Sequence, residues 1–272
     1  MRDLVDLLAG RDGGLELDRA ALLLATIEYP DLEIDSFVSL LDSHASELGE
    51  RVPASADGPE FVTAANEYLF VELGFEGNVT DYYNPSNSCL NDVLTQRTGI
   101  PITLSVVYME IARRLSRPVT GIGLPGHFIA RYDDGVFSTF VDAFHGGRLL
   151  DVNDCFEMAS SVTGEALPKD PGMLAPVSKA HIAGRMLNNL RGIYFQNRAY
   201  AKAAQVLDII LGAFPDSAAE YRQRAILHLR MSHLKGARSD LERYLELAPD
   251  APDREDVEKQ LVAIRRTFAG WN

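Results

Sequence analysis

The chain has 272 residues, of which 46% are hydrophobic and 24% charged, as in a globular protein with one large domain or two modest ones. Its formal net charge of −13 argues against a nucleic-acid or anionic membrane partner, because both carry negative charge themselves. With only Cys89 and Cys155, and with no recognisable signal peptide or membrane-spanning run, the sequence predicts a cytoplasmic protein that disulfides do not hold together.

The first 115 residues are predicted to be mainly helical. Apolar residues at helical spacing predict helices within residues 18–48 and again over residues 60–75. A short helix is expected over residues 89–97, with Ser88 as its cap, and a longer one over residues 103–115. In the longer helix the apolar residues recur at i, i+3, i+4 and i+7, which predicts one buried face.

The stretch that follows, GIGLPGHFIARYDDGVFSTFVDAF, contains the letters of a G-x-G-x-x-G motif at Gly121, Gly123 and Gly126. In a nucleotide site a helix must begin inside this motif, so that its N–H groups can meet the phosphates. Here Pro125 interrupts the motif, and the residues after it alternate as in a strand. A dinucleotide site is therefore not expected, and we predict no cofactor.

The same stretch predicts a β-hairpin. Asp134 and Gly135 favour a two-residue turn, and that register would pair Ala130 with Thr139 across the strands. It would also place His127 opposite Asp142, close enough for a hydrogen bond between the side chains. Such a pair is two thirds of a catalytic triad, but it can equally be a structural contact that closes the hairpin.

A second histidine, His145, follows Asp142 after three residues. His127, Asp142 and His145 could together approach a metal ion. The spacing matches no strong metal signature and no fourth ligand is evident, so we predict no metal site.

The C-terminal third contains a repeat. Two Pro-Asp pairs, at Pro215 and Pro249, lie 34 residues apart, and the same register aligns Ala203 with Ala237. This region resembles the tetratricopeptide repeat family over roughly 90 residues. The resemblance implies paired helices that form a protein-docking groove, although two such hairpins could instead only brace the preceding domain.

Much of the preceding region resembles the transglutaminase-like superfamily, and in particular its bacterial SirB-type group of uncharacterised proteins. The resemblance covers about residues 20–155 and rests on RRLSRPVTGIGLPGHF, NPSNSCLNDVLTQRTGIPITLSVVYMEIARRL and DAFHGGRLL. It implies a papain-like fold with a catalytic triad. By this resemblance His127 is the triad histidine and Asp142 the triad aspartate.

The third triad member of the superfamily is a cysteine at the start of the central helix, where the helix dipole lowers the pKa of a thiol. That place falls within residues 101–105, which contain no cysteine, so Ser105 or Thr103 would occupy it. Cys89 begins its own helix and is another candidate, although it comes one helix too early. Cys155 is interpreted as a packing residue.

These observations predict an α+β fold with a small antiparallel sheet, followed by an all-helical repeat region. The expected boundaries are a transglutaminase-like domain at 1–166, a linker at 167–176 and repeats at 177–272. Because the triad cysteine is missing, the sequence favours a non-catalytic module that binds a protein or peptide. The alternative is an acyl-transfer or amide-hydrolysing enzyme that uses Ser105 or Thr103 with His127 and Asp142.

Overall fold

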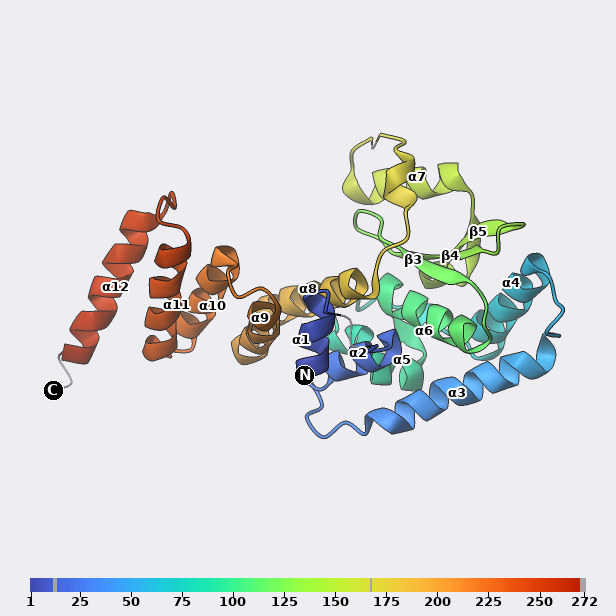
Figure 1. Ribbon diagram of the computed structural model, residues 1–272, viewed down its shortest axis with the longest axis horizontal. Helices are drawn as coiled ribbons and strands as arrows, with labels where there is room; N and C mark the ends of the chain where they lie inside the picture. Colours follow the sequence, from blue (N-terminus) through green and yellow to red (C-terminus); the bar gives the residue numbers. More distant parts are fainter. Residues whose placement is uncertain (12–13, 167, 270–272) are drawn as a thin grey trace. The chain divides into compact units, whose positions relative to one another are not determined.

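The structure is a computed structural model, drawn in Figure 1, and it describes residues 1–11, 14–166 and 168–269. Residue 167 of the predicted linker and residues 270–272 of the predicted repeat region lie outside the described residues. The chain divides into two compact units. One is Gly14–Leu187, and the other combines Met1–Gly13 with Asn188–Asn272.

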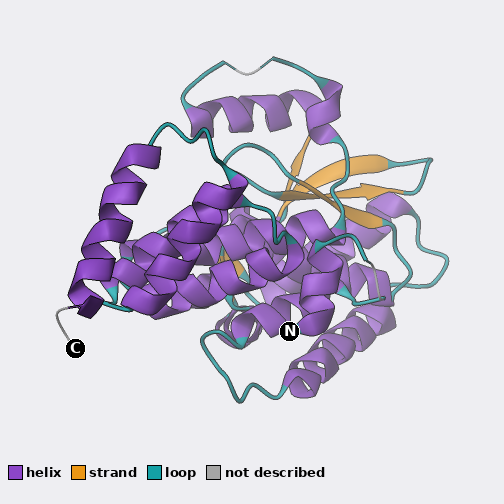
Figure 2. Ribbon diagram, turned by 60° about the vertical axis from the view of Figure 1, so that its left-hand side comes forward, coloured by secondary structure: helices purple, strands orange, loops and turns teal. Residues whose placement is uncertain are grey.

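The unit Gly14–Leu187 is built mainly of helices, in agreement with the sequence (Figure 2). They are α2 (Leu17–Ala25), α3 (Ile34–Arg51), α4 (Gly58–Asn66), α5 (Leu90–Gln96), α6 (Pro101–Arg114), α7 (Val152–Thr163) and the first half of α8 (Lys179–Gln196). A π-helical turn at Glu67–Glu72 extends α4. Two predicted ends differ: Cys89, not Ser88, is the N-cap of α5, and α6 already begins at Pro101, whose fixed φ suits a first helical turn.

A four-stranded antiparallel sheet carries the hairpin. Its strands are β3 (Val119–Ile122), β4 (Ile129–Asp133), β5 (Ser138–Asp142) and β6 (Arg148–Leu150), paired in chain order; β1 (Glu76–Gly77) and β2 (Thr98–Gly99) form a separate parallel pair. The helix α7 covers one face of the sheet through Cys155 and Phe156, which pack with Ile129 and Phe140. The helix α6 lies on the other side (Figure 1). The predicted α+β fold is confirmed.

The predicted hairpin turn is wrong in length. The loop between β4 and β5 has four residues, 134–137, and Ala130 pairs with Val141 instead of Thr139. The side chain of Asp134 accepts the N–H groups of Val136 and Phe137, which stabilises the longer loop. The register changes by two residues, so each side chain keeps its predicted face of the sheet.

The other unit contains α1 (Arg2–Leu8), which packs on α9 (Tyr200–Ala213). The second half of α8 contacts α9 through the rings of Phe195 and Tyr200. The helix α10 (Ala218–Arg230) pairs with α11 (Leu234–Leu247), and α12 (Arg254–Ala269) follows. Ala203 and Ala237 are both fully buried, as the repeat register predicts for positions where helices approach closely.

The repeat also extends to the backbone. The turn inside each hairpin contains one residue with positive φ, Arg198 at 57° and Ser232 at 58°, and these two residues are 34 positions apart. The hydrogen bonds around them repeat as well: the N–H of Ala199 donates to Tyr194, and that of His233 donates to His228. Two equivalent helical hairpins are therefore present.

Among the helices of the described residues, none combines the length with the apolar character that a bilayer crossing requires.

Candidate functional site

A tight turn positions His127 just before β4. The N–H of His127 donates to the carbonyl of Leu124 at 3.2 Å, and between them lie Pro125 and Gly126, the latter with φ of +66°. Proline followed by a residue with positive φ is typical of a type II turn. The Pro-Gly pair of the sequence thus explains why the chain reverses here and brings His127 to the end of the sheet.

Arg185 on α8 holds this turn from outside. Its Nη2 donates to the carbonyl oxygens of Leu124 at 3.1 Å and His127 at 2.9 Å, the two ends of the turn. The guanidinium also lies over the ring of Phe128, 5.4 Å from its centroid. These contacts fix the backbone from which the imidazole of His127 projects.

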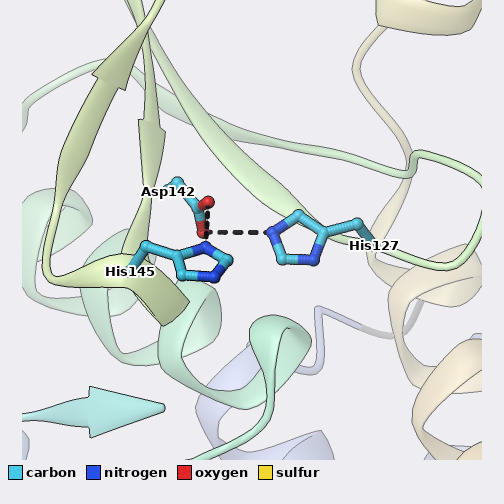
Figure 3. Close-up of side chains that lie close together, drawn as sticks. All are labelled: His127, Asp142 and His145. Atoms are coloured by element: carbon cyan, nitrogen blue, oxygen red, sulfur yellow. Dashed lines mark hydrogen bonds and ion pairs between the residues drawn. The ribbon is translucent and has the colours of Figure 1, made fainter. Parts of the chain in front are cut away.

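Asp142 ends β5 and is completely buried. Its Oδ1 accepts a hydrogen bond from Nε2 of His127 at 3.0 Å and another from the N–H of Phe144 at 3.2 Å. Its Oδ2 lies 2.6 Å from Nδ1 of His145. Figure 3 shows the carboxylate of Asp142 joined by dashed lines to the imidazole rings of both His127 and His145. The structure therefore brings His127 and Asp142 together, although the two are not directly opposed across the strands.

The two imidazoles control the charge of the buried carboxylate. Burial is the largest single influence and opposes ionisation of Asp142, but the hydrogen bonds and charges of His127 and His145 outweigh it, so the pKa of Asp142 is lowered. His127 is itself 6% exposed, whereas the side chain of His145 is 55% exposed. An ionised Asp142 accepts the Nε2 proton of His127 and leaves Nδ1 of that ring as the basic nitrogen.

The candidate hydroxyls lie on α6 and are both fully buried. The hydroxyl of Thr103 donates to the carbonyl of Asn87 at 2.7 Å and accepts the N–H of Ile100 at 3.1 Å, so it caps the start of the helix. The hydroxyl of Ser105 points to the carbonyl of Phe128, at 3.5 Å. Each side chain is thus used in a contact with the main chain.

The two cysteines are both buried and form no disulfide. Cys89 is the N-cap of α5 and is 0% exposed. Cys155 packs under the sheet, and burial raises the pKa of its thiol to about 12, which suits a packing residue better than a nucleophile.

Packing explains the G-x-G-x-x-G letters. Gly121 lies in β3, where a Cβ would come within 2.6 Å of the ring of Phe128. A Cβ on Gly123 would come within 2.6 Å of Nη1 of Arg185. The motif runs through a strand and a turn without starting a helix, so it lacks the geometry of a nucleotide loop.

The cluster also resembles part of a metal site. His127, Asp142 and His145 offer ligand atoms that all lie within 4.8 Å of one another. The ring nitrogens that face the carboxylate are both used in hydrogen bonds with it, and these bonds account for the cluster without an ion.

Comparisons with known proteins agree with this architecture. Residues 35–188 match the family model of the transglutaminase-like superfamily, and residues 190–262 match that of the tetratricopeptide repeat. A UPF0162 protein of Xylella fastidiosa is 38% identical over 258 residues, which cover 93% of this chain and 91% of the relative. F-box only protein 21 of Homo sapiens is 28% identical over 75% of this chain but only 36% of its own length. A crystal structure of menin aligns over 96% of this chain and 74% of that chain, with 11% identity and a TM-score of 0.41. That TM-score is too low to establish a shared fold.

The protein thus consists of a transglutaminase-like domain and tetratricopeptide repeats. The chain belongs to the transglutaminase-like superfamily and to the UPF0162 family. The predicted family resemblance is confirmed.

One residue of the site, Arg185, was not found from the sequence. A signal exists, however, because residues 171–207 contain no aspartate or glutamate, although the chain has 39 acidic residues. An arginine in such a segment has no acidic neighbour one helical turn away, so a role other than a helical ion pair could be inferred for it.

Proposed function

We propose that this protein is a non-catalytic module for binding a protein or peptide, with a degenerate triad. The observation that carries the proposal is the engagement of both candidate hydroxyls. Thr103 and Ser105 are buried and hydrogen-bond to main-chain carbonyls. A hydroxyl needs a base to become a nucleophile, and these hydroxyls are directed to carbonyl oxygens instead.

The repeat unit supplies a surface for a partner. Tetratricopeptide repeats generally mediate protein–protein interactions. A cavity of about 400 Å³ opens here between the repeated helices, and Phe195 on its lining is 52% exposed. A cluster of apolar and aromatic groups in a groove is a common recognition surface for peptides. The net charge of −13 favours such a partner over nucleic acid, and we place the module in the cytoplasm.

An acyl-transfer or amide-hydrolysing enzyme is the second candidate, because the hydrogen bond between His127 and Asp142 is intact. In that case Ser105 is the nucleophile, His127 the base and Asp142 the residue that orients it. The hydroxyl of Ser105 would have to turn from the carbonyl of Phe128 toward the imidazole.

The binding proposal can be tested with peptides selected from a random phage-displayed library against the full chain. We expect the selected peptides to lose affinity by about tenfold or more with Phe195→Asp, because the substitution places a charge in an apolar groove. Phe214→Asp is a matched control, since Phe214 is also a half-exposed aromatic residue of this unit but does not line the cavity. Equal losses with both variants would contradict the proposed groove.

The catalytic alternative is decided by mass spectrometry of the same peptides after long incubation. We expect wild type, His127→Ala and Ser105→Ala to return the peptides unchanged. Cleavage or acyl transfer by wild type that disappears with His127→Ala would replace the binding proposal by the enzyme.

A further inference from the structure

Arg185 has more hydrogen-bonding capacity than its contacts use. A guanidinium has five N–H groups, and the two on Nη2 donate to the carbonyls of Leu124 and His127. Within the described part of the chain, the remaining three, on Nε and Nη1, have no hydrogen-bond acceptor and no carboxylate pairs with this arginine. Partial burial without an acidic partner lowers the pKa of Arg185, although nearby Tyr82 opposes this shift.

Arg185 also lines an open pocket. Arg185 and His181 line a hollow of about 460 Å³ together with the glycine-rich segment 123–126 and Met173. Nη1 of Arg185 packs closely on Gly123, which also lines the hollow. A side chain at Gly123 would come within 2.6 Å of Nη1, so its absence leaves room beside this nitrogen.

The pocket is positively charged in a strongly acidic protein. None of its lining residues is acidic, and Arg185 supplies a permanent positive charge among them. The formal net charge of the whole chain is −13. A permanent cation with no acidic residue beside it in the lining favours an anionic ligand here.

We propose that Arg185 forms a binding site for a carboxylate group in this pocket. Each parallel pair of N–H groups on a guanidinium includes one from Nη2, and both of those are used here, so the carboxylate would accept single charge-assisted hydrogen bonds from Nη1 or Nε. One permanent cation balances the single charge of a carboxylate, whereas a phosphate dianion would require more. The apolar groups of Leu124, Pro125 and Met173 accommodate an aliphatic group next to the carboxylate.

The site is adjacent to the His–Asp pair. The carbonyl of His127 is held by the same guanidinium, and the ring of Phe144 lies between those of Tyr82 and His127, at centroid distances of 6.0 and 6.1 Å. The inference goes beyond the proposed function and does not depend on it. The same site would hold the carboxylate of a bound peptide or that of an enzyme substrate.

The test is a titration of the full chain with N-acetyl-leucine, in which the NMR signal of the Arg185 Nε–H group reports binding. We expect saturable binding with a Kd on the order of 1 mM, and binding of N-acetyl-leucinamide weaker by about tenfold, because the amide has no charge. Inorganic phosphate is expected to bind more weakly than the acid. N-acetyl-aspartic acid α-amide, which carries only a side-chain carboxylate, distinguishes an acidic side chain from a chain terminus as the source.

Two substitutions of the exposed residue His181 serve as a matched pair, one that adds a charge and one that does not. His181→Glu places a carboxylate four residues before Arg185 on α8, where the two side chains form a helical ion pair, so it should reduce affinity by about tenfold. His181→Gln adds no charge and should retain affinity within about threefold. Neither variant removes Arg185, so the turn at His127 keeps its support.

Three results would overturn the inference. One is a linear, unsaturated response to N-acetyl-leucine up to 50 mM, roughly fifty times the expected Kd. Another is equal binding of the acid and its amide, and the third is tighter binding of phosphate than of the acid. Peptide binding at the repeat groove is measured separately, so failure here leaves the proposed function standing.

Discussion

Asp142 and Asp240 are buried aspartates in different units of this protein, and they differ in what neutralises them. Asp240 on α11 is 3% exposed and accepts two hydrogen bonds from Arg224, at 2.9 and 2.6 Å. Nδ1 of His228 lies 3.3 Å from the same carboxylate. Asp142, by contrast, is bonded to two imidazoles and to one main-chain N–H.

The difference separates a structural ion pair from a candidate site. Arginine keeps its charge at every pH that a protein tolerates, and the carboxylates of Asp240 and Asp208 raise the pKa of Arg224 further. An imidazole that donates one ring N–H to a carboxylate has a second ring nitrogen that can act as an acceptor, which a guanidinium lacks. A buried carboxylate held by histidines can therefore orient a base, whereas one held by arginine mainly fixes two helices.

Among the variants that test the difference between the two aspartates, the largest loss of stability is expected for Asp240→Ala. The substitution leaves Arg224, whose side chain is 19% exposed, without its buried partner, so the free energy of unfolding should fall by about 3 kcal/mol. Urea denaturation followed by circular dichroism measures the change. Asp216→Ala is the control, because Asp216 pairs with Arg243 at a position where the aspartate is 81% exposed, and such a pair contributes little. A similar loss of stability in both variants would contradict a special role for the buried pair of Asp240 and Arg224.

A smaller effect is expected for Asp142→Asn, which keeps the shape of the side chain and removes its charge. Hydrogen bonds to a charged group contribute about 2 kcal/mol, so stability at pH 7 should fall by about that amount. The folded-state pKa of Asp142 lies below its unfolded value of about 3.9. Its stabilisation is therefore fully present above pH 4 and is lost as the pH falls through the folded-state pKa.

Urea titrations of wild type and Asp142→Asn between pH 7 and pH 3 check this behaviour. The gap between the two proteins should narrow at the acidic end. A gap that stays constant down to pH 3 would show that the carboxylate contributes shape alone and would weaken the comparison with Asp240.

The smallest effects concern the two hydroxyls. Thr103→Ala removes a helix cap and should cost about 1 kcal/mol. Ser105→Ala removes only a long contact of 3.5 Å and should change stability by less than about 0.5 kcal/mol. Thermal unfolding of the two variants measures both. The reverse order would show that Ser105 has a stronger interaction than its contact with Phe128.

Local sequence patterns predicted much of the fold. Helical periodicity located α3 and α6, and the 34-residue period located the paired helices of the repeats. The hairpin was predicted, but its loop was not, because the side chain of Asp134 competes with the two-residue turn by bonding to two N–H groups. Dipeptide preferences do not predict whether a side chain will hydrogen-bond within its own turn and so stabilise a longer loop.

The candidate site was predictable only in part. The contact between His127 and Asp142 was expected from the hairpin. It is present although the register differs by two residues, because such a shift leaves each side chain on the same face of the sheet. The bond between His145 and Asp142 depends on the short helical turn after β5, and the contact of Arg185 with the turn at His127 joins residues 58 positions apart. The contact of Arg185 follows from packing between distant parts of the chain, which local patterns do not encode.

The positive φ angles of Arg198 and Ser232 mark two places where the protein could be stabilised. The backbone of each residue adopts a left-handed conformation that costs about 1–2 kcal/mol relative to a right-handed one, and glycine would remove that cost. The main-chain hydrogen bonds at each turn offset this strain in the folded chain. Each turn therefore offers a position where a single replacement by glycine should make the protein more heat-resistant.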